Sequence, residues 1–163
     1  MSLLRILKQS KDLLRAADAP LLVTHVDPDG DAISSVLALG WGLRALRKSP
    51  ILACQDPVPD HLDFLPGFHD MMSGSVDRPF DLLVILDCSD PDRIGSVIPP
   101  DRRASAPILN IDHHVTNLGF GQVDLVDTEA TSTTHVLYHL IHPLDVPLDE
   151  RIAWTHRFDG IGE

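Results

Sequence analysis

The 163-residue sequence has few cysteines, few basic residues and no long apolar run. Its two cysteines, Cys54 and Cys88, lie in separate apolar segments without metal-type spacing, so we expect buried free thiols in a reducing cytoplasm. No apolar run approaches the roughly 20 residues that span a membrane. Lysine and arginine number 13 against 24 acidic residues, a net charge of −11, which argues against a protein that coats long duplex nucleic acid. Phosphate-bearing ligands stay compatible with this charge, because bound divalent cations invert the local field.

Short apolar segments recur along the chain. Four near-continuous runs predict strands buried on both faces of a parallel sheet, at residues 21–25, 51–55, 81–87 and 106–112. A further strand is predicted at 121–127.

Helical spacing separates these runs. It predicts helices over residues 31–49 and 131–142, and the Pro/Gly-punctuated stretch 56–79 has room for only a short helix. The first residues predict an amphipathic helix rather than a signal peptide, with one apolar side made of Leu3, Leu4, Leu7 and Leu14. The predicted fold class is therefore α/β, with a mainly parallel β-sheet flanked by helices.

Acidic and histidine side chains follow three of the predicted strands: His25 with Asp27, Asp29 and Asp31; Asp87 with Asp90; and Asp112 with His113 and His114. Because ligands of open parallel sheets bind outside the carboxyl ends of the strands, we expect these side chains to converge there. Burying unpaired carboxylates costs several kcal/mol each, and a cation removes that cost. Mixed Asp and His ligation without Cys favours Mn²⁺ or Mg²⁺ over a structural Zn²⁺. These ligands are more than one ion ordinarily needs. Two ions roughly 3.5–4 Å apart that share one carboxylate would use them all.

The segment "DPDGDA" has plainer interpretations. It is not an EF-hand loop, because Gly30 lies at loop position four and Ala38 occupies the position that needs a bidentate Glu. An Asp-rich turn shaped by Pro28 and Gly30, with Asp31 capping the next helix, is an alternative.

Other polar residues are open to two interpretations. His135, His139 and His142 could share one helix face as a zinc site, but a solvated polar face is favoured. Serines early in the helix after the Asp loop, and the Thr-Ser-Thr run before the last helix, are either ordinary first-turn and capping residues or phosphate contacts. The candidate substrate contacts among them are Ser35, Ser132 and Thr133.

Three segments together carry a family resemblance: "HVDPDGDAISS", "DLLVILDCSD" and "ILNIDHHVTNLGFG". They resemble the successive motifs of the DHH phosphoesterase superfamily (RecJ-like), over about Leu21 to Ala153. Within it, "DHHVTNLGFG" and "VDTEATSTTHVLY" are most similar to the bifunctional oligoribonuclease and pAp (3′-phosphoadenosine 5′-phosphate) phosphatase branch, the nano-RNases, rather than to family II pyrophosphatases.

The resemblance implies a site with two Mn²⁺ or Mg²⁺ ions. Its implied metal ligands are His25 and Asp29 on one ion, Asp31 and His113 on the other, and Asp87 bridging both. Asp112 would orient its neighbours, and His114 would contact the scissile phosphate and support the departing oxygen. Water activated by the two ions would then release a nucleoside monophosphate from short RNA, or inorganic phosphate from pAp. The resemblance further implies a cytoplasmic protein that forms a homodimer, as relatives often do.

The chain departs from the family pattern near its end. We expect a catalytic domain over residues 1–153 and an atypical tail over 154–163, from a truncation or a frameshift, with the family's C-terminal substrate-binding domain absent. Asp159 and Glu163 are the candidates for a further metal ligand that the family carries there. The alternatives are a cyclic-dinucleotide phosphodiesterase or pyrophosphatase on the same metal scaffold, or an inactive fragment.

Overall fold

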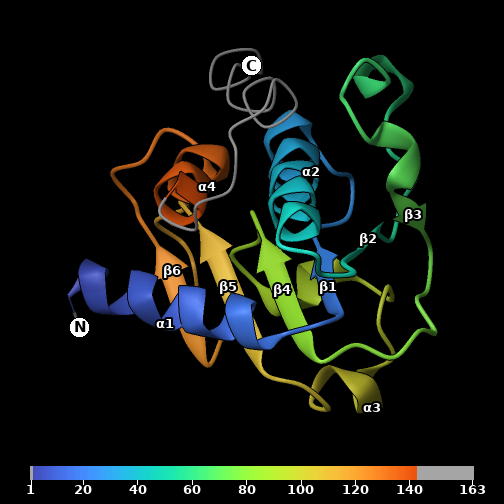
Figure 1. Cartoon of the computed structure of the whole chain (residues 1–163). Coiled ribbons are helices and arrows are strands. Elements are labelled where there is room, and N and C mark those ends of the chain that lie inside the picture. The colour runs from blue at the N-terminus through green and yellow to red at the C-terminus, as the bar shows by residue number, and fades with distance from the viewer. Residues whose placement is uncertain (1, 143–163) are drawn as a thin grey trace.

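A computed structural model of the chain describes residues 2–142 and contains one six-stranded sheet (Figure 1). The strands are β1 (Pro20–Val23), β2 (Ile51–Cys54), β3 (Met72–Ser73), β4 (Leu82–Leu86), β5 (Ile108–Asp112) and β6 (Val123–Val126). Every pairing is parallel, in the order β3-β2-β1-β4-β5-β6. The predicted fold class and the five predicted strands are confirmed; β3 was not predicted, because two residues are too few to leave an apolar run.

Four α-helices accompany the sheet: α1 (Leu3–Ala16), α2 (Gly30–Ala45), α3 (Pro100–Arg103) and α4 (Thr133–Ile141). Three 3₁₀ turns, at Asp60–Leu62, Phe68–Asp70 and Pro91–Ile94, complete the elements. The short helix expected within residues 56–79 is thus replaced by two such turns, which fits the prolines and glycines there. The expected boundary at residue 153 lies outside the described residues.

The strand order reverses direction between β1 and β4. From β1 the chain moves outward through β2 to β3, then crosses back to β4 on the other side of β1 and continues through β5 to β6. Leu21 of β1 pairs with Ile51 on one side and with Leu83 on the other. The loops after β1 and β4 therefore leave in different directions at the carboxyl edge, the position where parallel sheets bind ligands.

Both faces of the sheet are buried, as the apolar runs predicted. Helices α1, α2 and α4 cover one face, over Leu22, Val84, Leu109 and their neighbours (Figure 1). The alternate residues of the same strands face a second cluster, made mainly with the connections between strands: Leu21, Val23, Ala53, Leu83 and Ile85 pack with Val76, Ile94, Val97 and Ile98. This alternation follows from the two-residue period of a strand.

The amphipathic helix predicted for the first residues forms as α1, but its apolar side is only partly covered. Leu14 is fully buried, whereas Leu4 is 80% exposed and Leu3 45% exposed. Leu3 and Leu4 line a pocket together with Leu125 of β6 and Val136 of α4.

The cysteines are free and buried, as expected. The Cys54 thiol donates to the backbone oxygen of Asp56 at 2.9 Å, and the Cys88 thiol to that of Asp90 at 3.0 Å. Burial raises the pKa of each thiol to about 11. Within residues 2–142, no helix is long and apolar enough to cross a membrane.

Candidate metal centre

The loop after β1 is organised by Asp29. Its side chain accepts a hydrogen bond from the backbone N–H of Ala32 at 2.9 Å and caps α2. The alternative interpretation of this segment, an Asp-rich turn, gave the cap to Asp31, but Asp31 lies inside the first helical turn. Asp27, two residues earlier, has φ of 49°, a left-handed conformation that Asp tolerates better than most residues.

The first cluster consists of His25, Asp29 and Asp87, whose potential ligand atoms lie within 4.8 Å of one another. The His25 Nε2 lies 4.0 Å from Asp29 Oδ2 and 3.9 Å from Asp87 Oδ2. Its Nδ1 donates to the backbone oxygen of Val26 at 2.7 Å. That bond fixes the ring so that Nε2 faces the carboxylates, the arrangement typical of a metal-binding histidine.

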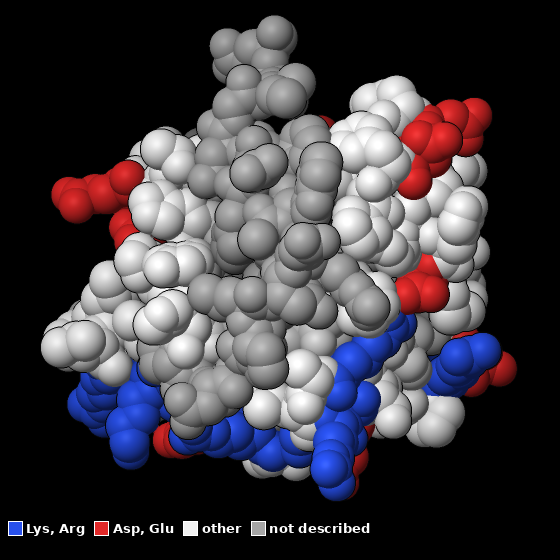
Figure 2. Space-filling model, turned by 45° about the horizontal axis from the view of Figure 1, so that its top comes forward, with Lys and Arg blue, Asp and Glu red and all other residues white. Residues whose placement is uncertain are grey.

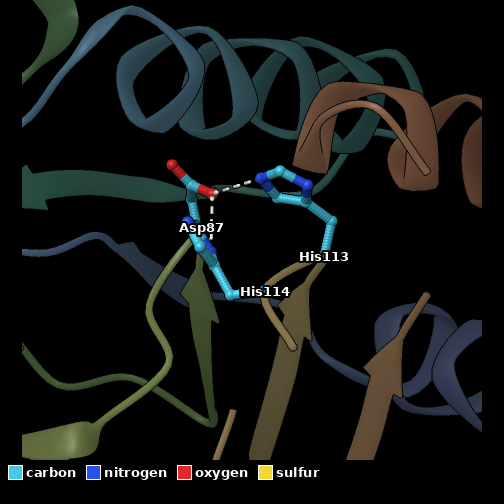
Figure 3. Close-up of side chains that lie close together, drawn as sticks. All are labelled: Asp87, His113 and His114. Atoms are coloured by element: carbon cyan, nitrogen blue, oxygen red, sulfur yellow. Dashed lines mark ion pairs between the residues drawn. The ribbon is translucent and has the colours of Figure 1, made fainter. Parts of the chain in front are cut away.

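The second cluster consists of Asp87, His113 and His114, again with ligand atoms within 4.8 Å. Figure 3 shows both rings turned toward one Asp87 oxygen: Oδ1 lies 3.8 Å from His113 Nε2 and 3.7 Å from His114 Nδ1. Asp87 thus faces the first cluster with Oδ2 and the second with Oδ1. A carboxylate in this position can bind two cations, one through each oxygen.

The two histidines of the second cluster are held differently. His113 Nδ1 lies 3.4 Å from the backbone oxygen of Ala130, leaving Nε2 toward Asp87, as in His25. His114 Nδ1 instead donates a hydrogen bond to Asp112 Oδ1, 2.7 Å away, because a carboxylate oxygen can only accept one. Nδ1 is therefore engaged with Asp112, which leaves Nε2 as the ring nitrogen that can act on a ligand.

Asp112 is fully buried and surrounded by donors. Besides the His114 ring, Oδ1 accepts the backbone N–H groups of His113 at 2.8 Å and His114 at 3.3 Å, and Oδ2 accepts the Asn117 side-chain amide at 2.6 Å. Partial burial alone would lower the pKa of His114, but the hydrogen bond to Asp112 and its negative charge, helped by Asp87 and Asp31, raise it.

Asp31 is bound by the N-terminus of α4. Its Oδ2 accepts the Thr133 N–H at 2.7 Å, and Oδ1 accepts the Thr134 N–H and hydroxyl, each at 3.1 Å. A helix N-terminus favours an anion through its free N–H groups and its dipole. Asp31 also lies 3.8 Å from His113 Nε2, although it belongs to neither cluster.

The candidate substrate contacts already have protein partners. Ser132 caps α4 by accepting the His135 N–H at 3.1 Å. The Thr133 hydroxyl, fully buried, donates to Asp87 Oδ1 at 2.8 Å, and the buried Ser35 hydroxyl lies 3.5 Å from Asp31 Oδ1. The sequence predicted a helix cap in this run. It did not predict that Thr133 and Thr134 would support Asp31 and Asp87, because these contacts join different elements.

The carboxylates of the site carry uncompensated charge. Among the described residues, every ion-pair contact of Asp29, Asp31, Asp87 and Asp112 is with a histidine. Burial, with the charges of Asp31 and Asp29, raises the pKa of Asp87 to about 8 despite the Thr133 hydroxyl and His114. In Figure 2, visible Lys and Arg side chains gather toward the lower side of the molecule. A set of imidazole and carboxylate ligands with unneutralised charge fits divalent cations.

Some sequence candidates stay outside the clusters. Asp90 caps the 3₁₀ turn Pro91–Ile94. His135 and His139 stack with ring centroids 5.2 Å apart on α4, and neither they nor His142 belongs to a three-residue metal group in the described part of the chain. Asp159 and Glu163 lie outside the described residues.

Partly buried carboxylates and histidines that could hold metal ions meet at the carboxyl ends of the strands in this α/β protein. Residues 21–156 match the family model described as DHH family, N-terminal domain, and the chain belongs to the DHH family. The predicted family and branch are confirmed.

Two curated relatives share the name bifunctional oligoribonuclease and PAP phosphatase NrnA. The Thermus thermophilus protein is 38% identical over 145 residues, covering 87% of this chain and 42% of the relative. The Bacillus subtilis protein is 30% identical over 124 residues, covering 76% and 38%. This chain therefore spans about two fifths of the length of these relatives.

A solved structure also matches. It is an exopolyphosphatase-related protein from Bacteroides fragilis, with a TM-score of 0.77 and 25% identity, covering 88% of this chain and 44% of that one.

Proposed function

We propose that this chain is the catalytic domain of a metal-dependent phosphoesterase that hydrolyses short oligoribonucleotides, pAp or both. The observation that carries the proposal is the position of Asp87, whose two oxygens face two histidine-containing clusters. The names of the two curated relatives support the substrate class, because both are oligoribonucleases and pAp phosphatases.

The proposed ions are two Mn²⁺ or Mg²⁺. His25 and Asp29 would hold one, Asp31 and His113 the other, and Asp87 both. The contacts of Asp31 with α4 and the Nδ1 bonds of the two histidines support these roles, since such bonds orient metal ligands. When bound, a pair of divalent ions supplies an acidified water and neutralises charge on the phosphoryl oxygens.

The proposed role of His114 is to contact the scissile phosphate. Its bond to Asp112 fixes the ring, and its raised pKa keeps the ring cationic to a higher pH. A cationic imidazole stabilises a negative phosphoryl oxygen and can donate a proton to the departing oxygen. Asp112, fully buried, contributes by orientation.

The hydroxyl groups near α4 have a different proposed role. Because Thr133 and Ser35 are buried against Asp87 and Asp31, we propose that they position these carboxylates in place of contacting substrate. Ser132 holds the first turn of α4, from which Thr133 and Thr134 reach Asp31. A homodimer and a cytoplasmic location, both implied by the family, stay predictions.

The test combines metal content with product analysis. The metal-stripped chain is loaded with Mn²⁺ or Mg²⁺, its ion stoichiometry is measured, and the same sample is given a ribodinucleotide, pAp, pyrophosphate or a cyclic dinucleotide. We expect two ions per chain and release of mononucleotide or of phosphate from pAp. Asp63→Ala, at an exposed position away from the clusters, is the control variant.

Two results would contradict the proposal. Faster cleavage of pyrophosphate or of the cyclic dinucleotide would assign the site to the alternative activities. Full metal loading without turnover of any of the four compounds would identify an inactive domain.

A further inference from the structure

Asn117 lies at the centre of a hydrogen-bond network behind His114. Its side-chain N–H₂ donates to Asp112 Oδ2 at 2.6 Å and to the backbone oxygen of Cys88 at 3.4 Å. Its side-chain oxygen accepts the Asn110 amide and the Gly119 N–H, each at 2.9 Å. One side chain therefore connects β5, the loop after β4 and the Asp112–His114 pair.

The network extends to the outer strand β6. The Asn110 amide, fully buried on β5, donates both to Asn117 and to Asp124 Oδ1 at 3.2 Å. Asp124 Oδ1 is held in turn by the Gly121 N–H at 2.8 Å. Asn110 Oδ1 is buried without a hydrogen-bond partner in the structure. Leaving such an oxygen unpaired is unfavourable. The two hydrogen bonds that the Asn110 N–H₂ group donates, to Asn117 and to Asp124, nevertheless hold the amide in this orientation.

These contacts allow only one orientation of the Asn117 amide. Rotating it by 180° would place its oxygen against the Asp112 carboxylate and its N–H₂ against the N–H₂ of Asn110. Both new contacts would be repulsive, since a carboxylate accepts only and an N–H₂ group donates only. The donor of Asn117 is therefore fixed toward Asp112.

We propose that Asn117 is a positioning residue for His114, acting through Asp112. The backbone N–H groups of His113 and His114 hold only Oδ1 of Asp112, and the terminal torsion of the carboxylate is soft. The 2.6 Å bond from Asn117 to Oδ2 fixes the carboxylate plane, so that Oδ1 faces the His114 ring at 2.7 Å. The expected change in turnover rests on the proposed function. The expected change in the His114 tautomer does not, because it is measured in the metal-free protein.

The first measurement is nitrogen NMR of the histidine rings in the metal-free chain, at a pH where the His114 ring is neutral. In the wild type we expect the His114 proton on Nδ1. In Asn117→Ala we expect a mixture of the two tautomers, because Oδ2 of Asp112 loses its donor and the carboxylate plane can turn away from the ring. Asn117→Asp, which places a second acceptor 2.6 Å from Asp112, should show a larger change. Thr116→Ala, at an exposed neighbouring position, should leave the spectrum unchanged.

The second measurement is kinetic. Asn117→Ala should bind two ions with unchanged KM while kcat falls by about 10–100-fold, the usual range for residues that orient a site. A purely structural role would lower the melting temperature but leave the His114 spectrum and kcat per folded molecule at wild-type values.

The outcomes are distinguishable. A wild-type His114 spectrum in folded Asn117→Ala would overturn the inference. Should that variant fail to fold, Asn117→Asp replaces the donor to Asp112 by an acceptor, and an unchanged His114 spectrum there would overturn the inference equally. A wild-type chain that turns over no substrate would contradict the proposed function alone, because the ring spectrum still decides the role of Asn117.

Discussion

His25 and Asp29, from the loop after β1, face one oxygen of Asp87, while His113 and His114, from the end of β5, face the other. The first pair is held by bonds within its own loop, from His25 to Val26 and from Ala32 to Asp29, and the Asp29 side chain is 66% exposed. The second pair depends on buried Asp112 and on a network that reaches β6. One cluster is therefore built by local chain geometry and the other by contacts between strands, and changes to each should act separately.

Replacing Asp87 should have the largest effect, because this carboxylate faces both clusters. We expect Asp87→Ala to lower Mn²⁺ affinity by more than ~100-fold and to abolish turnover, exceeding the range for residues that only orient ligands. Isothermal titration with Mn²⁺ checks this. A variant that still bound two ions would show that the clusters do not share a ligand.

Changes in the first cluster should remove one ion and spare the other. His25→Ala should bind a single Mn²⁺ per chain and lose turnover, because two-metal hydrolysis needs both ions. Asp29 also caps α2, so Asp29→Asn keeps the cap while losing a charged ligand, whereas Asp29→Ala loses both. Loss of both ions from His25→Ala or from Asp29→Asn would show that the two clusters do not bind their ions independently.

His114→Ala should separate turnover from metal binding. Since His114 Nδ1 is engaged by Asp112, the ring is not expected to hold an ion, and two ions should still bind. Turnover should fall by about 10²–10⁴-fold, the usual contribution of a general acid. Metal loss as complete as in Asp87→Ala would make His114 a ligand instead.

Thr133→Val should act more weakly on the shared carboxylate. It removes the hydroxyl that donates to Asp87 Oδ1 while nearly keeping side-chain shape. We expect Mn²⁺ affinity to fall by about 10-fold, at the low end for such supporting contacts. Thr133→Ser, which keeps the donor, should restore the affinity; failure to do so would point to packing rather than hydrogen bonding.

The last effect concerns the metal-free chain, whose stability should depend on pH. Asp87 has a raised pKa of about 8 in the folded state, against an ordinary Asp value of 3.8, so folding favours its neutral form. Its contribution to stability is fully present below 3.8 and is lost as the pH rises through about 8.

Melting temperatures of the wild type and Asp87→Asn, measured without metal across that range, check this. The wild type should fall relative to the variant as the pH rises. Added Mn²⁺ should reverse the loss for the wild type, because it stabilises the ionised carboxylate. Parallel curves for the two proteins would contradict the raised pKa.

Much of the fold followed from patterns within single segments. The near-continuous apolar runs at β1, β2, β4 and β5 predict strands buried on both faces, because each side of such a strand needs apolar cover. The two-residue β3 leaves no such pattern, and its pairing with β2 depends on the preceding turns. Periodicity predicted the apolar side of α1 but cannot show how much of it other elements cover, and Leu4 is 80% exposed.

The sequence by itself determined the chemical content of the site: His25, Asp29, Asp87, Asp112, His113 and His114 all follow apolar runs that become parallel strands, and parallel strands bring their carboxyl ends to one edge. The tertiary structure decided their partners. That α4 holds Asp31, that Asp87 faces two clusters and that Asn110 and Asn117 stand behind Asp112 all depend on side chains from different elements. Hydrogen-bond direction and burial arise only when those elements pack together, and no spacing along the chain encodes them.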